Sequence, residues 1–336
     1  MWTVRGTVEL NSQASEVGSG GAAAVALPAR SRLRTRLRRL DSKVSPYAYI
    51  FPFFAVFGVF GVFPLGYTAW VSLTDRTLLN PVSHWVALDN YTELLHDSYF
   101  WNAVENTIAI GLISMVPQLA LALVIAHVLN TKLHARTLFR MGILLPQVTS
   151  LVAVGLIFAQ LFSADYGLVN YVLNQFGISN VDWEAGRLSS WVALSVMVMW
   201  RWTGYNALIY LAAMQAIPDD LYEAAAVDGA RRWRQFFHIT IPMLRPTIIF
   251  TVIVSTIGSL QLFTEPYLFQ PNNRGLATGG SGRQYQTVTM YLYENAFGSS
   301  QFRFGYAAAI AWCLVLLIAV ISIFNFLVIR RIRSAE

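Results

Sequence analysis

One arginine stands in the middle of an otherwise charge-free apolar stretch. Arg201 is the single charged residue within residues 189–214. An arginine near the middle of a membrane helix costs about 2.5 to 3.5 kcal/mol, so something must compensate for it. Two interpretations follow: the guanidinium forms a structural ion pair or reaches toward an interface, or it faces a water-filled cavity. We favour the cavity.

Four further side chains in the apolar stretches suit the same cavity as Arg201. Aromatic faces suit the C–H surfaces of sugar rings, and arginine, glutamine and tyrosine side chains can hydrogen-bond to hydroxyl groups. A path for a carbohydrate is therefore predicted from the set Gln147, Arg201, Trp202, Tyr205 and Gln261. For the two glutamines, hydrogen bonding between helices is an almost equally good explanation.

The residues expected of an enzyme are missing from the sequence pattern. No cluster of acids or histidines lies in the apolar stretches, and His127 and His134 are separated by seven positions. A phosphate-binding loop needs Gly-Lys-Ser or Gly-Lys-Thr, which neither Lys43 nor Lys132 provides. The lone Cys313 excludes an intrachain disulfide and a cysteine-based metal site. We predict no catalytic residue, no metal site and no cofactor bound by this chain.

The elements that must position these residues are membrane helices. The 336 residues are 55% hydrophobic and only 12% charged, whereas about a quarter of the residues in a soluble domain are charged. A helix needs about 20 apolar residues to cross a bilayer core. The sequence predicts an all-α integral membrane protein with six such helices, at residues 47–73, 106–128, 141–162, 189–214, 246–263 and 304–329.

The basic residues predict which side faces the cytoplasm. Six spans put both termini on one side, and that side collects eighteen lysines and arginines against five on the other. Because basic segments stay in the cytoplasm during insertion, both termini are predicted to be cytoplasmic. Residues 1–45 are predicted to form a disordered basic tail, and residues 46–336 the membrane domain. An orientation signal explains the basic run 30–39 better than nucleic-acid binding does.

The loop between the fourth and fifth spans, residues 217–242, is too elaborate for a simple connection. After Pro218, Asp219 or Asp220 can accept the free N–H groups of a short helix, and Gly229 can adopt the left-handed conformation that ends it. A second amphipathic piece follows, whose apolar face is predicted from Ala230, Trp233 and Phe237. This loop has the features of a docking surface, with a self-packing loop as the alternative.

The same loop resembles the signature of bacterial ATP-binding-cassette (ABC) importer permeases of the maltose type. That signature reads Glu-Ala-Ala, three residues, Gly, nine residues, Ile, any residue, Leu, Pro. Here it is matched by Glu223-Ala-Ala, Gly229 and Ile239, with Ile241 in place of Leu before Pro242. The resemblance extends from about Tyr47 to the C-terminus, including similar residues at Asp89-Asn-Tyr and Asn106-Thr.

The resemblance implies a division of labour among several chains. The loop would be the coupling helix that enters the ATPase subunit, with contacts from Glu223, Ala224, Ala225, Asp228 and Gly229. Expected partners are a second homologous permease, a dimer of ATPases carrying ATP and Mg²⁺, and an extracytoplasmic solute-binding protein. Arg201, Trp202 and Tyr205 fall where maltose-type permeases place sugar contacts.

The resemblance therefore implies a multi-pass permease subunit in the bacterial cytoplasmic membrane that imports a di- or oligosaccharide by alternating access. The alternative is an ion-coupled secondary transporter, which should carry an acid within the membrane. Glu105 and Glu265 are the candidates for that acid, and both are expected at helix ends.

Overall fold

The computed structural model describes residues 45–79, 83–131, 136–270, 277–298 and 302–333. Within these ranges the secondary structure is helical, apart from one isolated bridge between Thr74 and Trp85. The predicted all-α fold is thus confirmed for the described part of the chain. The predicted tail lies outside it as far as residue 44. The chain divides into two compact units, residues 1–64 and 65–336.

The first unit contributes one apolar helical stretch. Helical residues run from Ser45, pass through a π-helical turn, η1 (Gly58–Val62), and continue into α2 (Phe63–Val71), which crosses into the second unit. Ser45–Val71 is long and apolar enough to cross a membrane, and most of its large side chains are exposed. An apolar helix with exposed side chains all round is suited to lipid contact. It matches the predicted first span within two residues.

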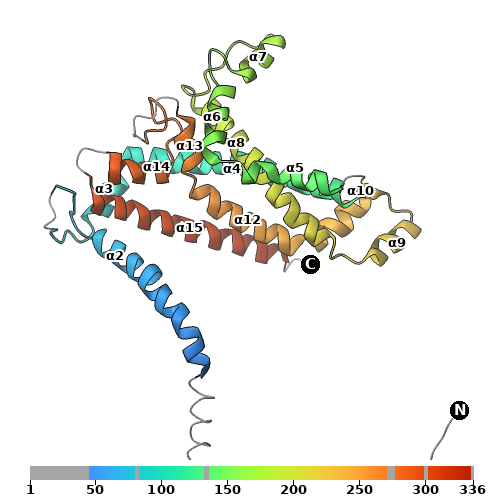
Figure 1. Cartoon of the computed structure of the whole chain (residues 1–336), viewed down its shortest axis with the longest axis horizontal. Helices are drawn as coiled ribbons and strands as arrows, with labels where there is room; N and C mark the ends of the chain where they lie inside the picture. The colour runs from blue at the N-terminus through green and yellow to red at the C-terminus, as the bar shows by residue number, and fades with distance from the viewer. Residues whose placement is uncertain (1–44, 80–82, 132–135, 271–276, 299–301, 334–336) are drawn as a thin grey trace, which may run out of the picture. The chain divides into compact units, whose positions relative to one another are not determined.

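Three long helices dominate the second unit: α4 (Ser98–Asn130), α8 (Arg187–Met214) and α15 (Phe304–Arg333). Among the described helices, α4 and α8 make the most extensive contact (Figure 1). Ser98–Asn130 and Phe304–Leu327 are also apolar enough to span a membrane. α8, which carries Arg201, is not among the candidate spans.

The predicted third span is not one straight helix. Residues 141–162 fall on α5 (Arg136–Val148) and α6 (Leu151–Leu161), which meet at a bend of 89°. Ser150, the N-cap of α6, has ψ 126°, which is outside the helical range. The expectation of a continuous helix is therefore wrong, because the chain changes direction at Thr149 and Ser150.

The predicted fifth span is a helix preceded by a second bend. α12 (Arg245–Leu260) follows residues 232–243, which form α10 (Arg232–Gln235), η2 (Phe236–Thr240) and α11 (Ile241–Met243), and the two parts meet at 67°. If each bent pair counts as one span, the described chain holds five candidate spans, and otherwise three. α13 (Thr264–Phe269) follows α12 after a short turn.

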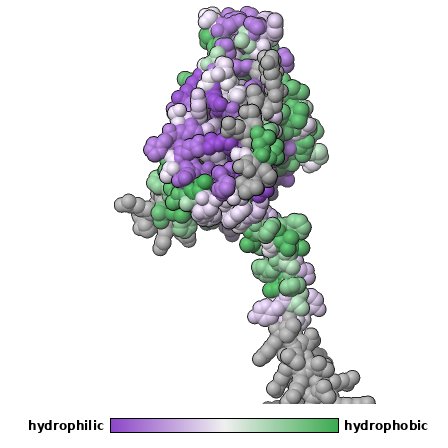
Figure 2. Space-filling model, turned by 90° about the vertical axis from the view of Figure 1, so that its left-hand side faces the viewer, coloured by the Kyte–Doolittle hydropathy of each residue, from purple (hydrophilic) through white to green (hydrophobic). Residues whose placement is uncertain are grey.

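Shorter helices occupy the two ends of the long axis of Figure 1. α3 (Asp89–His96) and α14 (Val288–Tyr293) lie at one end, and α9 (Asp219–Val227) lies at the other. α7 (Leu168–Gln175) extends from α6. Figure 2 faces the end with α3 and α14 and shows polar residues gathered over it, with apolar residues beside them.

Candidate functional site

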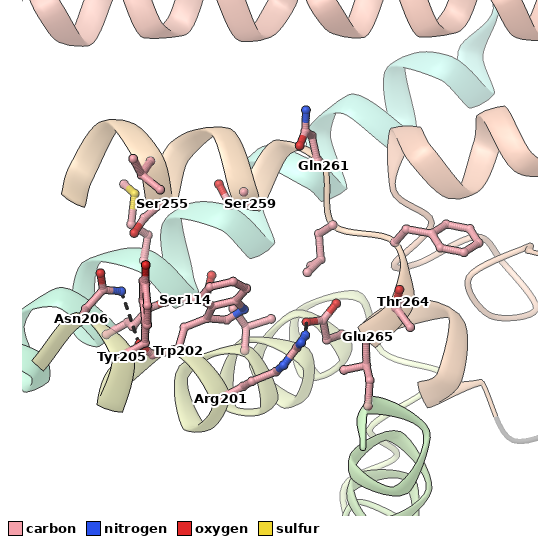
Figure 3. A pocket seen from close by; sticks show the side chains of 18 residues that line it. Ser114, Arg201, Trp202, Tyr205, Asn206, Ser255, Ser259, Gln261, Thr264 and Glu265 are labelled. Atoms are coloured by element: carbon pink, nitrogen blue, oxygen red, sulfur yellow. Dashed lines mark hydrogen bonds and ion pairs between the residues drawn. The ribbon is translucent and has the colours of Figure 1, made fainter. Parts of the chain in front are cut away.

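A cavity of about 470 Å³ opens between α4, α8, α12 and the start of α13 (Figure 3). This volume lies within the range of ordinary small-molecule sites. Eighteen residues line it. Besides the predicted side chains, its uncharged polar groups are Ser114, Gln118, Asn206, Ser255, Ser259 and Thr264. Polar groups in convergent positions within apolar helices mark a place that a polar ligand can occupy.

Both interpretations that the sequence left open apply to Arg201. Its side chain lines the cavity, and its Nη1 donates to Glu265 Oε1 at 2.8 Å. The two side chains are 18% and 6% exposed, so the pair is largely removed from solvent. A buried ion pair relieves the penalty of each single charge. Arg201 Nε is buried and has no hydrogen-bond partner among the described residues.

The two predicted aromatic residues stand beside this arginine. The guanidinium of Arg201 lies 5.4 Å from the centroid of the Trp202 ring, within the range of a cation–π contact. The Trp202 and Tyr205 rings meet edge to face with centroids 6.0 Å apart. Tyr205 is 43% exposed. The ring faces are therefore fixed relative to one another at the cavity wall, without being closed off by the chain itself.

The two predicted glutamines have different positions. Gln261 lines the cavity at the C-terminal end of α12 and is exposed. Gln147 does not line it; its Oε1 is buried, with no hydrogen-bond partner in the part of the chain that the structure describes. Leu151, which follows the bend between α5 and α6, is the residue from this part of the chain that lines the cavity.

Among the cavity residues that the sequence reasoning did not assign to the path, Glu265 is the one with a charge. It was expected at a helix end and it does lie in the first turn of α13, but it is buried, at 4% exposure. A signal was available, since Glu265 is the one acid between Pro246 and Gln270 and Arg201 requires a counter-charge. The pairing joins positions 64 residues apart, which no local pattern reveals.

The predicted docking helix forms as α9, and none of its residues is buried. Its N-cap is Pro218, and no side chain caps it, so the predicted role of Asp219 or Asp220 as the cap is wrong. At its other end Gly229 has φ +77°, which confirms the predicted left-handed residue. The Gly229 and Ala230 N–H groups donate to Ala226 and Ala225 carbonyls at 3.0 and 2.9 Å, as in a Schellman motif.

The five residues assigned to docking share this exposed segment. Four of them are exposed and one is half-buried, in the group Glu223, Ala224, Ala225, Asp228 and Gly229, with Ala225 the half-buried one. Val227 is 89% exposed, which is unusual for an apolar side chain. This end of α9 therefore offers small and apolar groups together with a carboxylate.

Side-chain contacts connect α9 with the helix bundle. The Tyr222 and Thr240 hydroxyl groups are hydrogen-bonded at 2.9 Å, and Gln235 Nε2 donates to the Tyr222 carbonyl at 3.4 Å. Phe236 is 6% exposed and packs in a core cluster with residues of α4 and α8. Trp233 and Phe237 share one face as predicted, with stacked rings 6.2 Å apart, and that face is exposed at 70% and 55%, whereas Phe236 anchors the piece in the core.

A polar cluster closes the end with α3 and α14. Asp97 accepts hydrogen bonds from the Tyr291 and Tyr306 hydroxyls, the latter at 2.7 Å. Burial alone would raise the pKa of Asp97, but these hydroxyls and the Tyr99 and Phe100 N–H groups outweigh it, so the pKa is lowered. Burial and the contact with Asp97 raise the pKa of Tyr291 to about 12.

A cavity lined by polar and aromatic groups within a bundle of apolar helices is the arrangement of a membrane transport protein. The chain belongs to the family of binding-protein-dependent transport system inner membrane components, which matches residues 107–334. The resemblance seen in the sequence is thereby confirmed. Because the family consists of transport components, the chain is a transport subunit and not an enzyme.

Named relatives are similar over most of the chain. The lactose transport system permease protein LacF of Rhizobium radiobacter is 38% identical over 88% of this chain and 97% of its own. The arabinooligosaccharides transport system permease protein AraP of Halalkalibacterium halodurans is 36% identical over 84% of this chain and 87% of its own. A chain of a bacterial alginate ABC transporter, solved in complex with an alginate pentasaccharide-bound periplasmic protein, has the same fold. Its TM-score is 0.70 at 22% identity, over 88% of this chain and 98% of that one.

Proposed function

We propose that this chain is the permease subunit of an ATP-driven importer that carries a di- or oligosaccharide across the bacterial cytoplasmic membrane. The observation that carries the proposal is the cavity between α4, α8, α12 and α13, where Trp202 and Tyr205 present ring faces beside hydrogen-bonding groups. Ring faces suit sugar C–H surfaces, and the surrounding amides and hydroxyls suit sugar hydroxyls. Lactose and arabinooligosaccharides are the cargoes named for two relatives.

The proposed topology has six spans with both termini in the cytoplasm. Five of the spans correspond to the candidate spans and bent pairs of the described chain, and α8 is the sixth. α8 is long enough, since 28 helical residues rise about 42 Å against a bilayer core of about 30 Å. The charge of Arg201, in the middle of α8, is compensated by Glu265, which supports an intramembrane position.

In this proposal the substrate path includes Arg201, Trp202, Tyr205 and Gln261. Gln147 was proposed with them from the sequence, and it would reach the path after a rearrangement of the bend between α5 and α6. Its buried Oε1, unpartnered within the described chain, leaves an acceptor free for such a change. Alternating access would open the path to either side of the membrane in turn.

The proposed coupling site is the exposed end of α9, with Glu223, Ala224, Ala225, Asp228 and Gly229. Docking onto an ATPase would cover the exposed Val227, and the Tyr222–Thr240 hydrogen bond would pass movement toward Phe236 and the bundle. The proposed assembly contains a second homologous permease, two ATPase copies that hold ATP and Mg²⁺, and an extracytoplasmic solute-binding protein.

The alternative, an ion-coupled secondary transporter, needs an intramembrane acid that binds the coupling ion. Glu265 is buried, but its carboxylate forms an ion pair with Arg201. The family described above transports with a binding protein. Neither observation favours ion coupling.

Transport by the complex in proteoliposomes tests the proposal. We expect ATP-dependent uptake of a lactose or arabinooligosaccharide probe, and a Trp202→Ala variant should transport about tenfold more slowly because it loses a stacking face. Trp200→Ala is the matched control, since Trp200 is on the same helix but does not line the cavity. Uptake that persists without ATP and collapses with an uncoupler would overturn the proposal.

A further inference from the structure

Arg201 and Glu265 are the two charged residues among the eighteen that line the cavity. Their charges are opposite and their nearest atoms are 2.8 Å apart. The pair therefore presents a dipole, and the wall carries no net charge. Figure 3 shows the two side chains reaching toward each other from α8 and α13 at one side of the cavity.

We propose that Glu265 is a specificity-determining residue: by cancelling the charge of Arg201 it makes the path selective for uncharged sugars over anionic ones. The inference rests on the proposed function, since it names the substrate class of the same cavity. An unpaired arginine in a cavity of low dielectric would attract a carboxylate strongly, because such an ion pair is charge-assisted and can be bidentate. Glu265 occupies the arginine in that role.

The burial of Glu265 explains why the ligand does not simply replace it. Its side chain is 6% exposed, and it is fixed in the first turn of α13. Displacing it would leave a carboxylate without a partner in a largely dry position, which is strongly unfavourable. A carboxylated sugar would therefore meet an arginine already occupied and a second negative charge beside it. A neutral sugar meets neither penalty and still has the Trp202 ring and neighbouring amides and hydroxyls.

The charge of the cavity can be measured without any sugar. In the assembled complex, Cys313→Ser removes the one native cysteine, and Thr264→Cys places a thiol in the cavity lining next to Glu265. Methanethiosulfonate reagents that carry either a sulfonate or a trimethylammonium group then compete for this thiol. The ratio of the two reaction rates reports the local electrostatic potential. Comparing each variant with the parent complex removes the contribution of the other subunits to that ratio.

Glu265→Gln should raise the ratio of anionic to cationic reaction rates on the order of tenfold, and Arg201→Gln should lower it comparably. The Arg201→Gln/Glu265→Gln double variant should restore the parent ratio, and Glu265→Asp is the charge-conserving control. If one single variant fails to assemble, the other and the double variant still decide the question. An unchanged ratio in the single variants would overturn the proposal, as would a double variant that differs from the parent.

Sugar binding to the complex without its binding protein provides the second measurement. The matched probes are lactose and the same disaccharide with the galactose C6 hydroxymethyl oxidised to a carboxylate. The parent should prefer lactose, and Glu265→Gln should shift the preference about tenfold toward the carboxylate. An unshifted preference would overturn the role of Glu265 in selectivity. If neither sugar binds the parent, the proposed sugar path fails, whereas the thiol ratios still decide whether Glu265 neutralises Arg201.

Discussion

The backbone carbonyl of Ile143 on α5 lies directly against Gly204 on α8, with no room between them for a Cβ atom. This close approach sets the distance between the two helices three residues from Arg201. Gly204→Ala should force the helices apart, at about 1 to 3 kcal/mol for an overpacked contact. We expect a lower melting temperature for the purified complex and slower transport. Gly142→Ala on α5 is the control, because a Cβ there meets open space. Equal melting temperatures for both variants would contradict the packing described.

The left-handed Gly229 gives a prediction for coupling. A Cβ there meets no neighbour, so only the backbone conformation restricts the residue, at φ +77°. Gly229→Val should cost about 1 to 2 kcal/mol in this conformation, whereas Gly229→Asn should be tolerated. In proteoliposomes the valine variant should lose sugar-stimulated ATP hydrolysis about tenfold and the asparagine variant should retain most of it. Similar losses for the two variants would show that φ is not the reason.

The Tyr222–Thr240 hydrogen bond predicts a measurable link between α9 and the bundle. Tyr222→Phe and Thr240→Val each remove one partner, and a hydrogen bond of this kind contributes about 0.5 to 1.5 kcal/mol. Each variant should transport less sugar per ATP hydrolysed, and the double variant should be no worse than the single ones because both remove the same bond. Tyr166→Phe, at a side chain that is 87% exposed, is the control. Additive losses in the double variant would show that the two residues act independently and not through their hydrogen bond.

The Asp97 cluster predicts a loss of stability at both acid and alkaline pH. A lowered carboxyl pKa stabilises the fold above the ordinary value of 3.8, and this stabilisation is lost as pH falls through the folded value. For Tyr291 the pKa is raised to about 12, so its contribution is complete below the ordinary value of 10.0 and is lost as pH rises toward 12. Melting temperatures of the complex across this pH range measure both losses, which form the acid limb and the alkaline limb of the curve.

In that titration Asp97→Asn should flatten the acid limb and Tyr291→Phe the alkaline limb. Tyr171→Phe, at a side chain that is 63% exposed, should leave both unchanged. An acid limb that is identical in the parent and in Asp97→Asn would show that another group governs acid stability.

Much of the helical architecture follows from local sequence. The predicted span 189–214 corresponds to α8 at Arg187–Met214, because a long apolar run without proline specifies helix by itself. Gly229 was predicted from its place after a helix-forming run, and its left-handed φ is a local property too. The Asp219 or Asp220 cap failed, since Pro218 takes the N-cap position and shifts both acids into the first turn.

The site depended on contacts between distant parts of the chain. Arg201 was recognised because a charge in an apolar run is anomalous on its own, whereas Glu265 looked ordinary until α13 was packed against α8. Phe236 and Phe237 are adjacent and equally apolar, and only the core beneath them decides which is buried. Helical periodicity gave the exposed face of Trp233 and Phe237, but not the buried anchor Phe236 beside it.

The bend at Thr149 and Ser150 has a consequence for how the protein enters its membrane. α5 and α6 contain 13 and 11 residues, which rise only about 20 and 17 Å, so neither half crosses a bilayer core by itself. Their stability comes from neighbours made later by the ribosome, α8 for α5 and α13 for α6. We therefore expect this part of the chain to stay beside the insertion machinery until its C-terminal neighbours are made.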